Sequence, residues 1–133
     1  MERTDELKNA SAEILANEAV KLMLEKKALD VKMFKVTDYT SITDFYVNVT
    51  GRSSTHVASL ADDISESFGL RGMDPYRVEG RAGNSWILVD FGSLIVNVFD
   101  SESRSFYNFD RLLPAELQVD ISELISEVDK KFS

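Results

Sequence analysis

Residues 86–99 read Trp-Ile-Leu-Val-Asp-Phe-Gly-Ser-Leu-Ile-Val-Asn-Val-Phe, and this stretch decides how the chain folds. Two apolar runs flank the dipeptide Gly92-Ser93, and a two-residue loop that begins with Gly is typical of a β-hairpin. With that loop, counting outward along both strands places Trp86 opposite Phe99. The stretch therefore predicts two antiparallel strands in a fixed register.

The two faces of this hairpin differ because side chains alternate between faces along a strand. One face is wholly apolar and is expected to lie on the core: Ile87, Val89, Phe91, Leu94, Val96 and Val98. The opposite face adds a carboxylate and an amide to large apolar side chains: Trp86, Leu88, Asp90, Ile95, Asn97 and Phe99. This second face is too apolar for water and too polar for a dry interior, so it is expected to contact a partner. Asp90 fits a turn-stabilising carboxylate as well as a partner contact.

Outside the hairpin, the spacing of apolar residues predicts four helices and three further strands. The helices are expected at about residues 5–27, 53–68, 102–113 and 119–132, and the strands at 31–36, 44–50 and 76–79. Gly69 is expected to end the second helix, and Pro114 the third. This order predicts an α/β fold in which helices flank a mixed sheet. No linker divides residues 1–133, so one domain is expected, with an amphipathic helix at its C-terminal end.

The amino-acid composition excludes some classes of function for this chain. The chain has no Cys and a single His among 133 residues, which excludes a disulfide framework and metal sites built from several imidazoles. The net charge is −8, so little direct contact with nucleic acid is expected, whereas a basic protein partner would be attracted. Negative charge also serves solubility, and charge alone does not separate these two roles. No signal peptide or membrane-spanning run is present, so a cytoplasmic protein without membrane contact is expected.

Three features invite an enzymatic interpretation. The loop around Gly51 joins a strand to a helix and could cradle phosphate, but it lacks the Walker and dinucleotide-binding patterns. Asp62 and Asp63 are adjacent within a helical pattern, whereas two-metal nucleotidyl transfer needs carboxylates that project from a strand to one side. His56 has no nucleophile and orienting acid arranged around it and is expected to pack in a loop or at the surface. A nucleotidyltransferase-like enzyme that binds nucleotide at the Gly51 loop is therefore the alternative, and a binding protein is favoured.

Seven short motifs follow one another within about residues 11–113. They are Ser41–Val47, Thr50-Gly51 with Ser53, Val57–Asp62, Pro75–Gly80, Trp86–Gly92, Val96–Phe99 and Arg104–Tyr107. Their order and spacing resemble the ribosomal silencing factor family, also called the Iojap family. Departures from the family pattern are Ser93 in place of Asp, Asn97 in place of His, Thr55-His56 in place of Arg-Gln, and the lack of Trp after Leu112. The segment beyond Pro114 lies outside the resemblance.

The resemblance implies a binding protein with a nucleotidyltransferase-like fold that lacks catalytic carboxylates, and it implies no cofactor or metal. It implies docking on the large ribosomal subunit through protein L-fourteen, which blocks joining of the small subunit and represses translation. The residues carried over to the docking face are Arg77, Trp86, Leu88, Asp90, Asn97 and Phe99, with Asp44 and Tyr107. The mixed hairpin face is also a candidate for pairing with a second copy of the chain, giving a homodimer of the free protein.

Overall fold

A mixed β-sheet forms the centre of the computed structural model, which describes residues 2–132. Within these residues the sheet has six strands in the order β3-β4-β5-β2-β1-β6. The strands are β1 (Leu29–Lys35), β2 (Phe45–Gly51), β3 (Arg77–Glu79), β4 (Trp86–Asp90), β5 (Leu94–Asp100) and β6 (Gln118–Val119). Only β2 and β5 pair in parallel, and the other neighbours are antiparallel. The predicted mixed sheet is confirmed.

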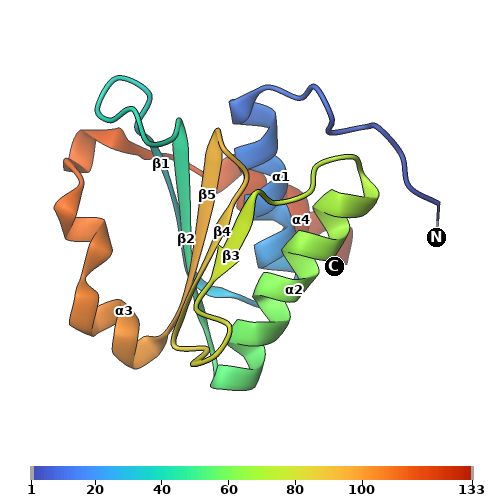
Figure 1. Cartoon of the computed structure of the whole chain (residues 1–133). Coiled ribbons are helices and arrows are strands. Elements are labelled where there is room, and N and C mark those ends of the chain that lie inside the picture. The colour runs from blue at the N-terminus through green and yellow to red at the C-terminus, as the bar shows by residue number, and fades with distance from the viewer. Residues whose placement is uncertain (1, 133) are drawn as a thin grey trace.

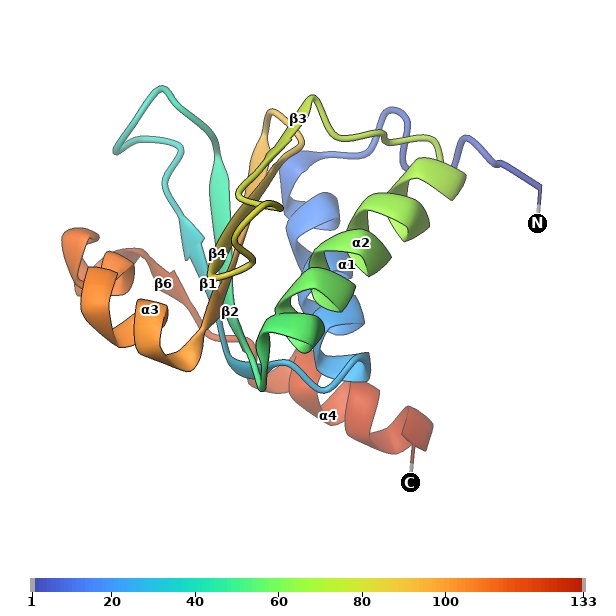
Figure 2. The same cartoon turned by 60° about the horizontal axis from the view of Figure 1, so that its bottom comes forward.

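The helices lie on both sides of this sheet (Figure 1). On one side are α1 (Ala12–Glu25), α2 (Ser54–Leu70) and α4 (Ser122–Phe132), and α4 packs beside α1 (Figure 2). On the other side are α3 (Ser101–Tyr107) and the short 3-10 turns η1 (Phe109–Leu112) and η2 (Ala115–Leu117) (Figure 1). No helix in residues 2–132 has both the length and the apolar character needed to cross a membrane.

The hairpin at the centre of the sheet has the predicted register. Trp86 lies opposite Phe99, and the turn is closed where the Phe91 N–H donates to the Leu94 carbonyl at 2.8 Å. The apolar face is buried in the main core together with side chains of α1 and α2, and each of its six side chains is at most 2% exposed. Burying this face against two amphipathic helices supplies the main apolar contribution to folding.

Two of the predicted helix ends are wrong. The first helix begins at Ala12 rather than near residue 5, because Ser11 caps it by accepting a hydrogen bond from the Ile14 N–H. The second helix continues through Gly69 and ends at Leu70. The chain turns away from the helix only at Gly72, which has φ +95°. Gly72 rather than Gly69 therefore supplies the left-handed conformation that ends a helix.

The predicted third helix, residues 102–113, is also interrupted. Asn108 adopts φ +50° and ends α3 at Tyr107, after which the chain continues as η1. The two-residue strand β6, which pairs with Met33 and Phe34 of β1, was not predicted. The C-terminal helix then begins at Ser122, where its N–H donates to the Asp120 carboxylate at 2.9 Å.

Candidate functional site

The second face of the hairpin is partly covered by the chain itself. Asn97 and Phe99 are 1% and 0% exposed, because β5 is a central strand and α3 and η1 fold back over it. The expectation that these two side chains touch a partner directly is therefore corrected, since both lie beneath the surface. Trp86 and Leu88, on the neighbouring strand β4, remain partly exposed on the same face.

Trp86 is the centre of an aromatic cluster at one end of this face. Its ring lies 4.9 Å from the Phe99 ring and 4.8 Å from the Tyr107 ring, measured between centroids. Tyr107 is 49% exposed and Phe106, beside it on α3, is 79% exposed. We call the surface formed by Trp86, Phe106 and Tyr107 the aromatic platform. Partly exposed Trp and Tyr side chains held by packing are the kind of group that anchors protein interfaces.

A shallow groove lies next to the aromatic platform. It is lined by Glu79, Gly80, Trp86 and Leu88 and has a volume of about 310 Å³. Trp86 and Leu88 give it apolar lining, and Glu79 adds a carboxylate. Such a lining suits a partner side chain with an apolar stem.

Arg77 and Asp90 form a polar cluster near the hairpin turn. The Arg77 guanidinium donates from Nε to Asp90 at 3.0 Å and from a terminal nitrogen to Glu79 at 2.7 Å. Asp90 also accepts the Gly92 N–H at 2.7 Å, so it performs the turn-stabilising role expected from the sequence. The hydrogen bond to Asp90 and the charge of Glu79 raise the pKa of Arg77. Burial and the charge of Asp90 raise the pKa of Tyr46.

Asp44 lies at the same end as the hairpin turn. Its N–H lies 3.2 Å from the Ser93 carbonyl, to which it donates, and its carbonyl accepts the Val36 N–H at 2.8 Å. Because β2 and β5 are parallel and in register, Asp44 is near the turn while Tyr107 is near the opposite end of the hairpin. The predicted residues therefore form a band along one face of the sheet, with an aromatic end and a charged end.

A chain of hydrogen bonds runs beneath this band, and sequence reasoning missed it. The Trp86 indole N–H donates to Asn97 at 3.0 Å, Asn97 donates to Asn48 at 3.0 Å, and Asn48 donates to Asp110 at 2.7 Å. These residues come from β4, β5, β2 and η1, in that order. The signal available in the sequence was an Asn in the middle of each of two otherwise apolar strands.

Arg104 of α3 closes this chain. It is 8% exposed, donates from Nε to Asp110 at 2.9 Å and donates to the Thr50 hydroxyl at 3.0 Å. A second guanidinium nitrogen lies 2.8 Å from Asp110. This ion pair, between a buried Arg and a half-buried Asp, thus fixes α3 and η1 against the sheet.

The Gly51 loop has a structural explanation. A Cβ atom on Gly51 would lie 2.6 Å from Val57 Cγ2, so glycine allows α2 to pack directly on the end of β2. At the helix start, Ser53 accepts the His56 N–H at 3.1 Å through its side chain and the Val57 N–H at 2.9 Å through its carbonyl. These two N–H groups are therefore engaged in capping and in the first helical hydrogen bond, which gives the Gly51 loop a structural role.

His56 and Asp62 also have structural partners. The His56 ring accepts the Arg52 N–H at 2.9 Å, and its other nitrogen lies 2.9 Å from the Lys26 carbonyl. This is the loop-packing role expected of His56. Asp62 receives two hydrogen bonds of 3.1 Å from Arg81. Residues 2–132 contain no group of three or more His, Cys, Asp or Glu side chains placed to hold a metal ion.

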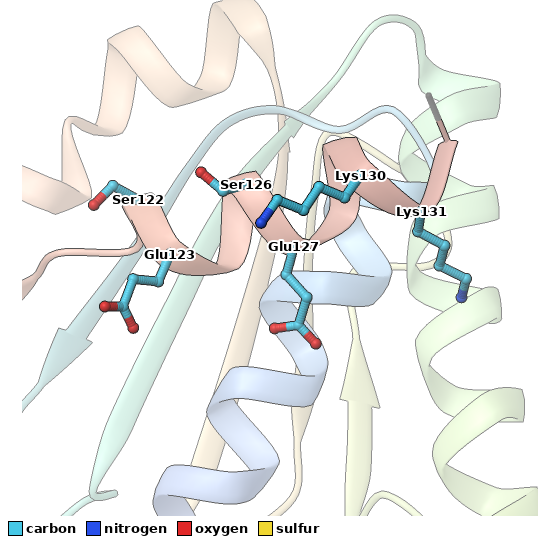
Figure 3. A pocket seen from close by; sticks show the side chains of 6 residues that line it. All are labelled: Ser122, Glu123, Ser126, Glu127, Lys130 and Lys131. Carbon is cyan, nitrogen blue, oxygen red and sulfur yellow. The ribbon is translucent and has the colours of Figure 1, made fainter.

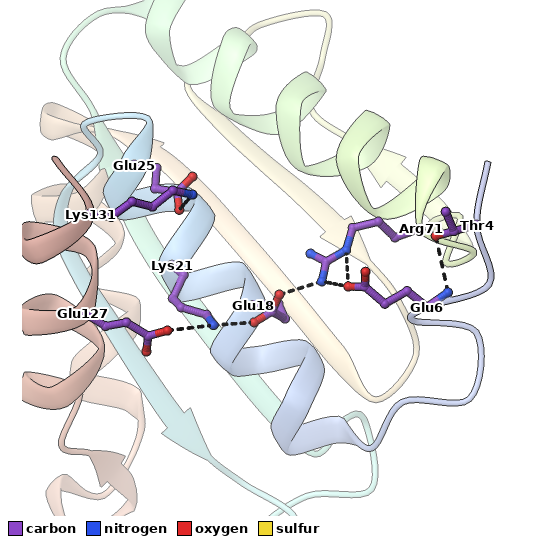
Figure 4. Close-up of polar contacts among 8 residues, drawn as sticks. All are labelled: Thr4, Glu6, Glu18, Lys21, Glu25, Arg71, Glu127 and Lys131. Atoms are coloured by element: carbon purple, nitrogen blue, oxygen red, sulfur yellow. Dashed lines mark hydrogen bonds and ion pairs between the residues drawn. The ribbon is translucent and has the colours of Figure 1, made fainter. Parts of the chain in front are cut away.

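The opposite side of the sheet carries a depression lined by charged and hydroxyl side chains of α4. This depression is lined only by residues of that helix, and their side chains do not converge on one point (Figure 3). Beside it, a chain of ion pairs links Glu6, Arg71, Glu18, Lys21 and Glu127 (Figure 4). These contacts join the N-terminal segment, α2, α1 and α4, so their role is to hold the helices together.

Comparisons with known proteins identify the family of this chain. A family model described as "Ribosomal silencing factor during starvation" matches residues 8–133, including the segment beyond Pro114. A ribosomal silencing factor of Halalkalibacterium halodurans is 29% identical over 108 residues, covering 81% of this chain and 92% of that protein. A mouse protein named "Mitochondrial assembly of ribosomal large subunit protein 1" is 27% identical over 96 residues, covering 70% of this chain and 42% of the mouse protein.

A solved structure shares the fold. A crystal structure of a Chromobacterium violaceum protein matches with a TM-score of 0.74 at 24% sequence identity, covering 77% of this chain and 85% of that one. The family model spans almost the whole chain, and it includes every element that builds the band. The chain belongs to the ribosomal silencing factor family.

Proposed function

We propose that this protein docks on the large ribosomal subunit through protein L-fourteen and blocks joining of the small subunit by occupying the surface between them. The observation that carries the proposal is the partly exposed aromatic platform and its groove, held on a rigid sheet in a member of the ribosomal silencing factor family. The name of the mouse relative, which refers to the large ribosomal subunit, also supports a large-subunit partner. The mechanism needs occupancy only and no catalysis.

Each part of the band has a role in this proposal. Trp86, Leu88 and Tyr107 form the apolar contact, and Arg77, Asp90 and Asp44 form the polar contact at the turn. Asn97 and Phe99 act from below by supporting the Trp86 ring. The net charge of −8 favours a basic surface on the partner. The protein would work in the compartment that holds the ribosomes, with little direct contact to ribosomal RNA.

Two measurements test the proposal. Sedimentation of purified ribosomal subunits should show less subunit joining when saturating protein is added. Calorimetry should show binding to isolated L-fourteen, and Trp86→Ala should weaken it by tens of fold, because a central aromatic anchor contributes about 2 kcal/mol or more. Ile14→Ala is the matched control, since Ile14 is 51% exposed and lies on α1, across the sheet.

The outcomes separate the partner from the mechanism. Unchanged subunit joining at saturating protein would contradict the silencing mechanism, and no binding to L-fourteen would contradict the partner. Equal binding by the Trp86 and Ile14 variants would remove the aromatic platform as the docking site. Light scattering over a range of concentrations tests the competing use of this face, self-association into a homodimer.

A further inference from the structure

The position of Trp86 in the chain does not by itself fix the orientation of its indole ring. Trp86 begins β4, next to the 80–85 turn, and one side of its ring borders the open groove. A side chain that becomes ordered on binding loses conformational entropy, which weakens the affinity. A side chain that is already ordered in the free protein avoids this loss and binds more tightly. Contacts within the free protein must therefore fix the orientation of the indole.

The hydrogen-bond chain beneath the band defines one orientation for every group in it. The indole N–H can only donate, and the Asp110 carboxylate can only accept when ionised. These two ends fix how the amides of Asn97 and Asn48 are turned, with each oxygen toward Trp86 and each nitrogen toward Asp110. Asn97 and Asn48 are 1% and 0% exposed, so water does not compete for these bonds.

The acidic end of the chain is held by α3. Arg104 pairs with Asp110 and lies over the Phe99 ring, with its guanidinium carbon 5.8 Å from the ring centroid. The same segment contributes Tyr107 and Phe109, whose rings lie 4.8 Å and 6.1 Å from Trp86. The Trp86 ring is therefore held by two kinds of contact. Its N–H donates to Asn97 below it, and its ring packs against Tyr107 and Phe109, in the segment that Arg104 attaches to the sheet.

We propose that Asn97 and Asn48 are positioning residues that hold Trp86 in the orientation required for docking, with the Arg104–Asp110 pair as their anchor. This inference rests on the proposed function, because it assigns a role within the same docking surface. Neither Asn touches the partner. They act through Trp86, and Asn48 acts through Asn97.

The decisive variant is Asn48→Ala, two links away from the indole. Trp86 is the only Trp of the chain, so the NMR signal of its indole N–H reports on one group without assignment ambiguity. In the full-length protein we expect Asn48→Ala to shift this signal and speed its exchange with solvent. We also expect about tenfold weaker binding to L-fourteen, equivalent to about 1.4 kcal/mol. If Asn48→Ala does not fold, Asn48→Ser, which leaves a smaller cavity, replaces it.

The control separates positioning from general loss of stability. Val20→Ala removes a fully buried side chain of α1 across the sheet, and it should lower the unfolding temperature without changing the indole signal or the affinity. Asn97→His retains one acceptor and one donor, so it should preserve both readouts. An unchanged indole signal in Asn48→Ala would overturn the positioning role, and a changed signal with unchanged affinity would overturn its importance for docking. Failure of the unaltered protein to bind L-fourteen would instead refute the proposed function, and the indole signal would then decide the positioning role alone.

Discussion

The carbonyl oxygen of Trp86 occupies the space that a Cβ atom on Gly80 would need, and Gly80 has φ +94°. Glycine at position 80 thus permits both the left-handed turn after β3 and the close approach of the start of β4. Because Gly80 also lines the groove, the shape of the groove depends on a residue that has no side chain.

We expect Gly80→Ala to lower the free energy of unfolding by about 2 kcal/mol, since a side chain in this backbone conformation is strained and the contact forces β4 to move. Urea denaturation measures the change. Gly83→Ala is the matched control within the same turn, because a Cβ on Gly83 has no heavy atom within 4 Å. Equal stability of the two variants would contradict the role assigned to Gly80.

A second prediction concerns the ion pair of buried Arg104 with half-buried Asp110. Removing the carboxylate with Asp110→Ala leaves an 8% exposed guanidinium without its closest partner, so unfolding should become easier by about 3 kcal/mol. Asp30→Asn is the control, since Asp30 lies 3.6 Å from Arg104, its side chain is 55% exposed, and Asn also tolerates its left-handed φ of +47°. This control should cost less than about 1 kcal/mol. If thermal or urea denaturation shows similar losses of stability for the two variants, Asp110 contributes no more to folding than exposed Asp30.

The hairpin was predictable from sequence because neighbouring residues along the chain determine its turn and its register. Strand alternation and the Gly92-Ser93 loop determine which side chains share a face, and the observed pairing of Trp86 with Phe99 follows from counting. The core side of α2 was predictable for the same reason, since helical spacing gives the buried residues Val57, Leu60, Ala61, Ile64 and Phe68.

The error at Asn97 and Phe99 has a non-local cause. Their burial depends on α3 and η1 turning back over β5, which follows from the left-handed Asn108 and from the contact of Arg104 with Thr50, 54 residues earlier. Neither the conformation of one Asn nor a pairing over that distance can be read from hydrophobic periodicity. The sequence therefore indicated which face was unusual, but not how much of it the chain covers.

A third prediction concerns acid stability of the helix layer. Burial alone would raise the pKa of Glu18, but hydrogen bonds and charge from Lys21 and Arg71 outweigh it and lower the pKa. A lowered pKa in the folded state means that Glu18 stabilises the fold above its unfolded pKa and loses that contribution as pH falls through the folded pKa. Glu18→Gln should therefore reduce stability at pH 7 and show a smaller further loss on acidification below about pH 4.5.

Urea unfolding at neutral and acidic pH provides the comparison for Glu18. Glu66→Gln, which neutralises an exposed carboxylate on α2, is the control and should have little effect at pH 7. An identical pH dependence for Glu18→Gln and the unaltered protein would show that the ion pairs of Glu18 in Figure 4 do not contribute to folding stability.

The last prediction concerns His56, which connects the start of α2 to the end of α1. Its two ring nitrogens are each 2.9 Å from a backbone group, the Arg52 N–H and the Lys26 carbonyl. His56→Ala removes both contacts and should lower the free energy of unfolding by about 1–2 kcal/mol, because each hydrogen bond contributes about 0.5–1.5 kcal/mol. Thr55→Ala, at the exposed neighbouring position, should change stability by less than about 0.5 kcal/mol. His56 joins the ends of α1 and α2, which cover the face of the sheet opposite α3, so binding of His56→Ala to L-fourteen should equal that of the unaltered protein. A loss of binding without a loss of stability would place His56 in the docking surface instead.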